Sequence, residues 1–336
     1  MLPLLNNPSL STGSRILVTG ANGYIASHII DLLLELGYNV RGTIRSPKPW
    51  LDEFFHSRHS TTHYESVTLS NLNDATTLDE IMRDVSGVIH VASDVSLSPD
   101  TSVIDKTIKS TQLLLQCAAK HSSIRRVVLT SSSTAALLPQ PNKPGIRVTH
   151  ETYNDLAVSL AYSPTTPPAQ KPFLVYAASK TEGERHAWNW VRENDPGFVF
   201  NTVLPGTNFG KILHPHIPGS TMSFIRGLQA GNDFAVRAIP PQWFINVQDT
   251  ARLHITALLD RSVTSERIFG FARPFNWTDV LDVLRESGVK DGVLPAVPEN
   301  EARDLGEVVP SRRAEELLVR SWGREGWVGL EESVLS

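Results

Sequence analysis

Residues 15–30 read RILVTGANGYIASHII, and this stretch decides the fold. Residues 16–18 are apolar and largely β-branched, which predicts a buried parallel strand. From Ile25 to Leu34 apolar residues recur at helical spacing, which predicts a helix. A strand, a small-residue turn and a helix in this order place a helix N-terminus where it can bind a pyrophosphate.

The turn between strand and helix is built from small residues. Gly20 would allow a tight turn, and Gly23 would let the backbone approach phosphates without an intervening Cβ. Ala26 is the third small position, where the helix must pack closely on the strand. An ordinary strand–helix turn is the alternative, but the position of the glycines between the two elements favours a dinucleotide site.

The composition excludes several classes of protein. The chain has 336 residues, of which 40% are hydrophobic and 20% charged, as in ordinary globular proteins. A net charge of −4 gives no electrostatic footprint for nucleic acid or for an anionic membrane. The single cysteine, Cys117, excludes an internal disulfide, and its apolar neighbours predict a buried packing residue. Residues 1–14 lack a signal-peptide pattern, and no apolar run approaches the ~20 residues that span a bilayer.

From these features we expect a cytoplasmic α/β protein with a Rossmann-type doubly wound parallel sheet and a smaller C-terminal substrate-binding lobe. We expect a monomer or homodimer without a nucleic-acid partner or membrane span. The dinucleotide-binding domain should cover 14–205, and 206–336 should form most of the lobe, with some elements packing back on the sheet. Further strands are expected at 40–44, 64–69, 87–93, 126–133, 198–204 and 244–249, and helices at 76–83, 103–120, 176–192 and 250–259.

A long segment rich in Pro, Ser and Thr interrupts this pattern at 139–173. Loops of this length in compact domains are usually functional or mobile. We therefore expect 163–172 to lie beside the active cleft, with a plain surface excursion as the alternative.

The end of the second expected strand is basic. A site that selects NAD places Asp or Glu about 20 residues past the glycines, where it binds the ribose 2′-hydroxyl. Here Arg41, Arg45 and Lys48 precede the first acid, Asp52. Because these cations would bind a 2′-phosphate and a carboxylate would repel it, we favour NADP(H) over NAD. Solvated surface cations are the alternative.

Tyr176 and Lys180 are four residues apart, so on one helix they project from the same face. An adjacent ammonium favours the phenolate and lowers the pKa of the tyrosine, which suits it to general acid–base catalysis. A run of hydroxyl residues ends the strand expected at 126–133, and Ser132 or a neighbour could donate a hydrogen bond to a substrate carbonyl. Capping of the strand end is the alternative for this run.

These motifs together resemble the extended short-chain dehydrogenase/reductases of the NAD-dependent epimerase/dehydratase superfamily. Within it the chain is most similar to the branch of dihydroflavonol reductases, cinnamoyl-CoA reductases and fungal aldehyde/ketone reductases. The resemblance covers roughly residues 14–275. It is carried by residues 19–26, Thr130-Ser131-Ser132, residues 176–180 and Asn246-Val247-Gln248-Asp249.

The resemblance implies roles for individual positions. Ser132 matches the catalytic serine, Tyr176 the catalytic tyrosine, and Lys180 the lysine that also holds the nicotinamide ribose hydroxyls. Arg45 matches the arginine that many members use on the 2′-phosphate, and Lys48 would assist it. The other positions that it assigns to the cofactor are Gly20, Asn22, Gly23, Tyr24, Ile25, Asn71, Leu72, Val91, Ala92, Ser93 and Pro205.

The chain departs from the family pattern at two positions. Asn71 stands where the family usually has an Asp for the adenine, and Leu113 where many members carry an Asn. Asn71 puts the contacts to the adenine in doubt, and Leu113 puts the hydration of the active site in doubt. Neither removes the catalytic trio.

Other candidates for functional residues are weaker. His56, His59 and His63 have helical spacing but no acid or cysteine partner that would complete a metal site, so no metal is expected. His214 and His216 could rim the substrate cleft. Aromatic residues after Pro205 could line an apolar pocket or belong to the core: Phe209, Phe224, Phe234, Trp243 and Phe244.

The leading hypothesis is an NADPH-dependent reductase that transfers a hydride to the ketone or aldehyde carbonyl of a small apolar or aromatic metabolite. Tyr176 would then act as the general acid. A sugar-nucleotide epimerase or a hydroxysteroid-type dehydrogenase is the first alternative, although an epimerase normally retains NAD and the basic strand end argues against that. A non-catalytic NADP-sensing regulator is the second, although the chain keeps Ser132, Tyr176 and Lys180.

Overall fold

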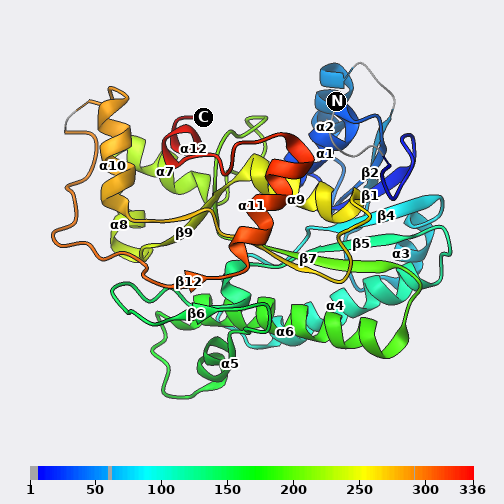
Figure 1. The fold of residues 1–336 in the computed structure, drawn as a ribbon, viewed down its shortest axis with the longest axis horizontal. Helices are drawn as coiled ribbons and strands as arrows, with labels where there is room; N and C mark the ends of the chain where they lie inside the picture. The colour runs from blue at the N-terminus through cyan, green and yellow to red at the C-terminus, as the bar shows by residue number, and fades with distance from the viewer. Residues whose placement is uncertain (1–6, 60–62, 291) are drawn as a thin grey trace.

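A parallel sheet lies at the centre of the molecule in this computed structural model, which describes residues 7–59, 63–290 and 292–336 (Figure 1). Within these residues seven strands form the sheet in the order β10-β7-β5-β4-β1-β2-β3, and every pairing is parallel. The order reverses between β1 and β4, which is the point where doubly wound sheets bind ligands. The strands are β1 (Arg15–Thr19), β2 (Asn39–Ile44), β3 (Tyr64–Thr68), β4 (Val85–His90), β5 (Arg126–Thr130), β7 (Val199–Pro205) and β10 (Arg267–Gly270).

Helices cover both faces of the sheet, so the expected Rossmann-type fold is confirmed. In Figure 1, α1, α9 and α11 lie above the sheet, and α4 and α6 lie below it. The helices that flank the sheet are α1 (Tyr24–Glu35), α2 (Pro49–His59), α3 (Ala75–Ile81), α4 (Ser102–Ala119), α6 (Lys171–Asn194), α9 (Val247–Leu259) and α11 (Ser311–Trp322).

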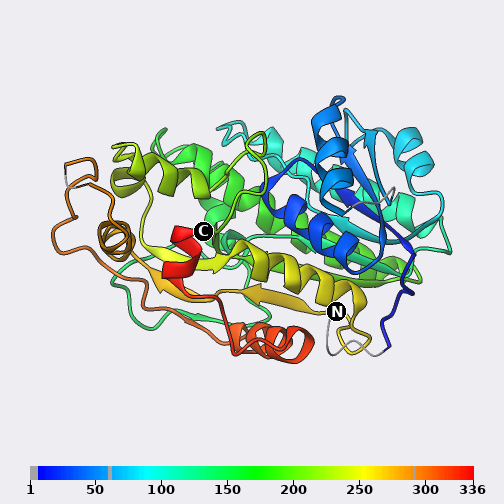
Figure 2. The same ribbon diagram turned by 90° about the horizontal axis from the view of Figure 1, so that it is seen from above.

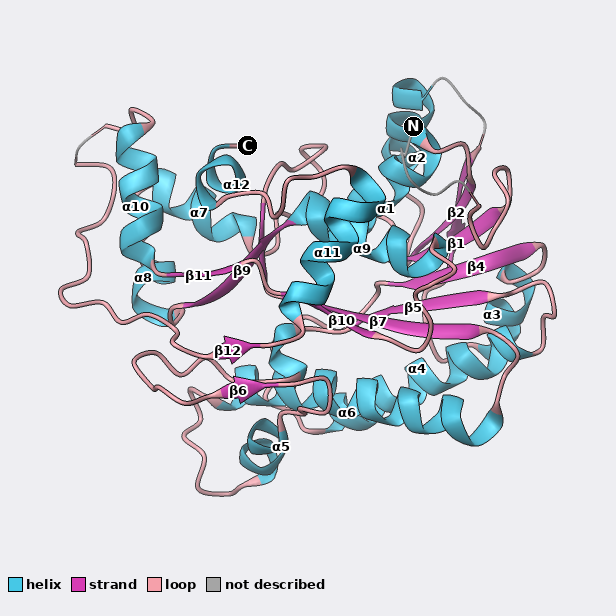
Figure 3. Ribbon diagram, viewed as in Figure 1, coloured by secondary structure: helices cyan, strands magenta, loops and turns pink. Residues whose placement is uncertain are grey.

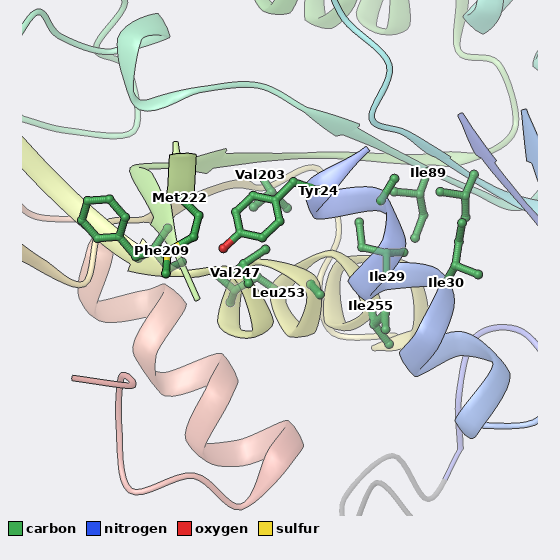
Figure 4. Packing of buried hydrophobic residues seen from close by; sticks show 14 of the residues in the cluster. Tyr24, Ile29, Ile30, Ile89, Val203, Phe209, Met222, Val247, Leu253 and Ile255 are labelled. Carbon is green, nitrogen blue, oxygen red and sulfur yellow. The ribbon is translucent and has the colours of Figure 1, made fainter. Parts of the chain in front are cut away.

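The largest hydrophobic cluster packs α1 beside α9 on one face of the sheet. Ile29 and Ile30 of α1 are fully buried, and Figure 4 shows them beside Ile89 of β4 and Ile255 of α9. Burial of such side chains contributes about 1.5–3 kcal/mol each to folding. The first turn of α1 is thereby fixed against the ends of the strands.

The second part of the chain carries its own small sheet, drawn apart from the central one in Figure 3. Its strands and neighbouring helices are β8 (Thr207–Phe209), β9 (Gln242–Asn246), β11 (Arg273–Phe275), α7 (Met222–Gln229), α8 (Phe234–Ala238), α10 (Trp277–Glu286) and α12 (Leu330–Leu335). However, β10 pairs with β7 in the central sheet, and α9 packs against α1 (Figure 2). The division at residue 205 stays a prediction.

The segment 139–173 is more structured than expected. It contains β6 (Arg147–Val148), which pairs with β12 (Glu307–Val308), and α5 (Asp155–Tyr162). The α5 helix begins where the Asn154 side chain accepts a hydrogen bond from the backbone of Ala157, at 3.1 Å. The expectation of one continuous loop is therefore wrong, because a local cap and a distant strand organise the segment.

Several element boundaries also differ from the expected ones, and three of them bear on the site. Helix α6 begins at Lys171, with Pro172 in its first turn, so Tyr176 lies in the second turn and does not open the helix. Strand β5 ends at Thr130, and the three serines follow it. Helix α9 begins at Val247 because the Asn246 side chain caps it, accepting from the Gln248 backbone at 2.8 Å.

Aromatic residues after Pro205 belong mainly to the core. Phe209 and Phe244 are fully buried, whereas Phe224 and Trp243 are partly buried and Phe234 is exposed. No helix of the described residues has the length and apolar character to cross a membrane.

Candidate active site

The turn after β1 has the geometry that its glycines predict. Gly20 has φ +72°, and a Cβ there would lie 3.2 Å from the Cα of Ala92. The backbone N–H of Gly23 donates to the Gly20 carbonyl at 2.8 Å, which closes the turn. Helix α1 then begins with no side-chain cap and no acid in its first turn. Its N-terminal N–H groups and positive dipole end are therefore available to an anion.

A cleft of about 750 Å³ opens beside this turn. Its wall is formed by the carboxyl ends of β1, β2, β4 and β5, by parts of α4 and α6, and by the loop at Pro218 and Ser220. The cleft thus lies where the strand order reverses, as expected for an open α/β sheet. A glycine turn that a Cβ would obstruct, leading into an uncapped helix, fits the pyrophosphate of a dinucleotide.

The wall beside β4 is held by one hydroxyl. Strand β4 stops at His90 because the N–H groups of Val91 and Ala92 both donate to Thr19 Oγ1, each at 3.0 Å. With both acceptor positions used, the Thr19 hydroxyl donates its hydrogen to His90 Nδ1 at 2.8 Å. His90 is therefore the neutral tautomer with its proton on Nε2, and it lines the cleft.

Ser132 and Tyr176 meet just beyond the end of β5. Ser132 Oγ accepts from the Thr134 backbone at 3.2 Å and from the Thr134 hydroxyl at 3.0 Å, so its own hydrogen remains available. Burial raises the pKa of Tyr176, and the hydrogen bond with Ser132 opposes that rise. Ser132 thus caps a short turn and also faces the phenol, so capping and a catalytic role do not exclude each other.

Lys180 lies one turn further along α6 and points at the same strand end. Its Nζ donates to the Thr130 carbonyl at 3.3 Å, and the side chain is buried. Burial lowers the pKa of Lys180 to about 8, although the charge of Glu184 opposes this. Burial raises the pKa of Tyr176, so the acidification of the phenol that was expected from Lys180 is not found in this structure.

The comparisons with known proteins agree with this geometry. A model of the NAD dependent epimerase/dehydratase family matches residues 16–269. The chain belongs to this family.

Two curated relatives and one solved structure place it further. It is 43% identical over 332 residues to a protein named ketoreductase adrE from Penicillium rubens, covering 98% of this chain and 96% of the relative. It is 35% identical over 340 residues to aldehyde reductase 2 of Sporidiobolus salmonicolor, covering 98% and 96%. The yeast methylglyoxal/isovaleraldehyde reductase Gre2, solved with NADPH, has a similar fold, with a TM-score of 0.76, 24% identity and coverage of 95% and 96%. The expected family and its reductase branch are thus confirmed.

Most of the cofactor positions expected from the epimerase/dehydratase pattern line the cleft: Gly20, Asn22, Gly23, Tyr24, Ile25, Arg45, Asn71, Leu72, Val91, Ala92, Ser93 and Lys180. Lys48 and Pro205 do not line it, and Pro205 is buried where β7 pairs with β10. Ser132 and Tyr176 are not part of the wall either, but their neighbours Ser131 and Lys180 are. The cofactor roles of all these residues stay predictions.

Arg41 and Asn71, two residues expected near the cofactor, make hydrogen bonds to other parts of the protein. Arg41 donates to Glu65 at 2.7 Å and to carbonyls after α3, so it is directed away from the cleft. Asn71 Oδ1 accepts from the backbone of Asn73 at 2.9 Å and holds a turn. The loop expected beside the cleft at 163–172 contributes no residue to its wall.

Sequence reasoning missed several residues of this site. His90 and Glu184 line the cleft, as do Asp94 and Lys106, which face each other closely enough for Lys106 to lower the pKa of Asp94. The hydrogen bonds of Asp94 with Ser96 lower that pKa more strongly. Glu184 had a signal, because it lies one helical turn after Lys180 on the same face.

The other histidines singled out from the sequence make local contacts outside the cleft. His56, His59 and His63 hydrogen-bond to Tyr64, Asp31 and Asn39 respectively. His214 stacks on Trp50 with ring centroids 4.7 Å apart, and His216 contacts the same ring from its edge. Neither His214 nor His216 lines the cleft. No group of three or more potential metal ligands occurs among the residues that the structure describes.

Buried neutral histidines make stability depend on pH. His254 Nδ1 donates to the Thr250 carbonyl at 2.7 Å, and its Nε2 accepts from the Thr130 hydroxyl at 2.8 Å. Burial lowers the pKa of His254 to about 4 and that of His90 to about 3. The unfolded chain binds these protons below pH 6.5 and the folded chain does not. Stability is therefore complete above pH 6.5 and falls toward pH 4 by about 1.4 kcal/mol per pH unit for each histidine.

We expect His254→Gln to lower the free energy of unfolding at pH 7. Between pH 6.5 and pH 4 that free energy should fall less steeply than in the wild type, by about 1.4 kcal/mol per pH unit, because one buried histidine is gone. Urea unfolding at a series of pH values measures this slope. The exposed His216→Gln serves as the control and should leave the slope unchanged. Equal slopes for the wild type and His254→Gln would contradict the assignment.

Proposed function

We propose that the chain is an NADPH-dependent reductase that transfers a hydride to the ketone or aldehyde carbonyl of a small apolar or aromatic metabolite. The observation that carries the proposal is the convergence of Ser132 and Tyr176 at the end of β5, beside Lys180 in the dinucleotide cleft. The names of the relatives, ketoreductase and aldehyde reductase, support the reaction class. The NADPH in the yeast reductase of the same fold supports the cofactor.

Each residue of the trio has a defined task in this reaction. NADPH supplies the hydride when it is bound. Ser132 would donate its hydroxyl hydrogen, which the bonds from Thr134 leave unused, to the substrate carbonyl oxygen, and this polarises the carbonyl. Tyr176 would then give its phenolic proton to the alkoxide, and Lys180 would hold the nicotinamide ribose by its ammonium.

The raised pKa of Tyr176 is consistent with a proton donor. A phenol with the ordinary pKa of about 10 is already protonated near neutral pH, and burial raises the pKa of Tyr176 further, so the reduction would begin with its proton in place. The oxidation of an alcohol would instead need the phenolate, which the same burial disfavours.

The direct test is a screen of aldehydes, β-keto esters and aromatic ketones with the purified protein. Loss of NADPH absorbance reports turnover, and each carbonyl compound is also tested with NADH. We expect NADPH oxidation with at least one class. Tightly retained NAD together with epimerisation of sugar nucleotides, or NADPH binding without any turnover, would contradict the proposal.

Arg45 should set the preference for NADPH. It lies in the cleft wall, is exposed, and makes no ion pair with any residue that the structure describes. We expect Arg45→Ala to raise the KM for NADPH by about tenfold to a hundredfold and to leave that for NADH nearly unchanged, because only NADPH carries the 2′-phosphate. Lys48→Ala is the matched control and should have a smaller effect, since Lys48 does not line the cleft. Equal changes for both cofactors would contradict this role.

A further inference from the structure

Glu184 is a buried carboxylate that the proposed reaction does not use. Its side chain is fully buried on α6, one turn after Lys180. An isolated carboxylate at such a site would be strongly destabilising, so its partners matter. They come from three different strands or strand ends of the central sheet.

Five donors surround this carboxylate. The Ser131 hydroxyl donates to Oε2 at 2.8 Å, and the Thr202 hydroxyl donates to Oε1 at 2.7 Å. The Arg267 guanidinium donates to both oxygens, at 2.8 and 3.2 Å, and the Trp188 indole contacts Oε1 at 3.4 Å. The carboxylate thus joins α6 to the end of β5, to β7 and to β10.

Arg267 is itself held in place from its far side. It donates to the carbonyls of His150 and Thr152 at 2.6 and 2.9 Å. Its guanidinium also lies 4.0 Å from the centre of the Tyr153 ring. Because Arg267 is fixed by the segment between β6 and α5, the position of the Glu184 carboxylate is fixed as well.

The Glu184 carboxylate is linked to Ser132 through Ser131 and to Lys180 through its charge. The Glu184 carboxylate accepts a hydrogen bond from Ser131, which directly precedes Ser132 in the chain. The residue before Ser131 is Thr130, and its carbonyl accepts a hydrogen bond from Lys180. On the helix, Glu184 is four residues from Lys180, and both residues are among those that form the cleft. The negative charge of Glu184 raises the pKa of Lys180, against the larger lowering caused by burial.

We propose that Glu184 is a positioning residue, which fixes the end of β5 at Ser131 and Ser132 and acts as the counter-charge of Lys180 within the cleft. The inference rests on the proposed function, because it assumes that Lys180 acts as a cation on the bound cofactor. Arg267 completes the arrangement by holding both oxygens of the carboxylate in place.

The experiment compares pH profiles of kcat for NADPH-dependent reduction. In Glu184→Gln the charge is lost while the shape is kept. We expect kcat to fall about tenfold at pH 8, and the decline at high pH to begin at least half a pH unit lower, because Lys180 then loses its proton more easily. Thr202→Val removes one hydrogen bond to the same oxygen and keeps the charge. It should lower stability without moving the profile.

Ser131→Ala separates the two actions of Glu184. It cuts the bond to the end of β5 and keeps the charge, so we expect a lower kcat with an unmoved pH profile. If Glu184→Gln does not fold, the double variant Glu184→Gln/Arg267→Met is used instead. It removes both charges of the buried pair, so no unpaired charge remains in the interior. We expect its pH profile of kcat to shift in the same way.

The outcomes are distinguishable from failure of the proposed function. An unmoved pH profile and a kcat equal to that of Thr202→Val would overturn the inference on Glu184 while the reductase activity stands. Absence of NADPH oxidation in the wild type, or full activity of Tyr176→Phe, would overturn the proposed function itself. Binding of NADPH, followed by its fluorescence, is measured for every variant to separate loss of turnover from loss of cofactor.

Discussion

Tyr176→Phe is expected to lower kcat for carbonyl reduction by about 10²- to 10⁴-fold, the usual contribution of a positioned general acid. The phenol faces Ser132, and a tyrosine carries its proton near neutral pH even at its ordinary pKa of about 10. The substitution removes one oxygen and no apolar contact, so the fold and the binding of NADPH should persist. Absorbance of NADPH under saturating substrate measures kcat, and fluorescence titration measures cofactor affinity.

The control for this prediction is Tyr162→Phe. Tyr162 ends α5 and has 53% of its surface exposed, and it has no part in the cleft wall. It should keep full activity. A Tyr176→Phe protein that turns over as fast as this control would show that another group donates the proton.

Gly20→Ala is expected to weaken NADPH binding by about tenfold to a hundredfold. The residue has φ +72°, where a Cβ costs roughly 1–2 kcal/mol. The new Cβ would also lie 3.2 Å from the Cα of Ala92 and 3.3 Å from its Cβ, so the wall beside β4 must shift. Isothermal titration with NADPH measures the loss of affinity.

Gly13→Ala separates backbone strain from this collision. Gly13 has φ +83°, but a Cβ there meets nothing within 4 Å. Both variants should lose roughly 1–2 kcal/mol of stability from the backbone alone in urea unfolding, and Gly20→Ala should lose more because of its contact with Ala92. Only Gly20→Ala should lose cofactor affinity, and equal NADPH binding by the two variants would contradict the role of the turn.

The repeating part of the fold could be read from sequence because strands and helices alternate with regular apolar periods. The turn at Gly20 and Gly23, with the strand before it and the helix after it, determines the crevice. The segment 139–173 could not be read in this way. Its order depends on pairing of Val148 with Val308, which is 160 residues away in the chain and carries no local pattern.

The site was predictable to the extent that it depends on motifs. The spacing of Tyr176 and Lys180 placed them on one face of α6 beside the strand end, but it could not give their electrostatics. The pKa of the phenol depends on burial, which the local sequence does not report. The position of Glu184 on the same helix face could be predicted from its spacing to Lys180. Its partner Arg267 could not, because Arg267 lies 83 residues further along the chain, in an edge strand.

The distance between Glu184 and Arg267 in the sequence affects how the protein folds during translation. Glu184 leaves the ribosome 83 residues ahead of Arg267, so the nascent nucleotide-binding half holds a carboxylate whose cation has not yet been synthesised. Closing the sheet around it must await translation of β10. A gene cut after codon 205 would encode a fragment that holds the Glu184 carboxylate without its Arg267 partner.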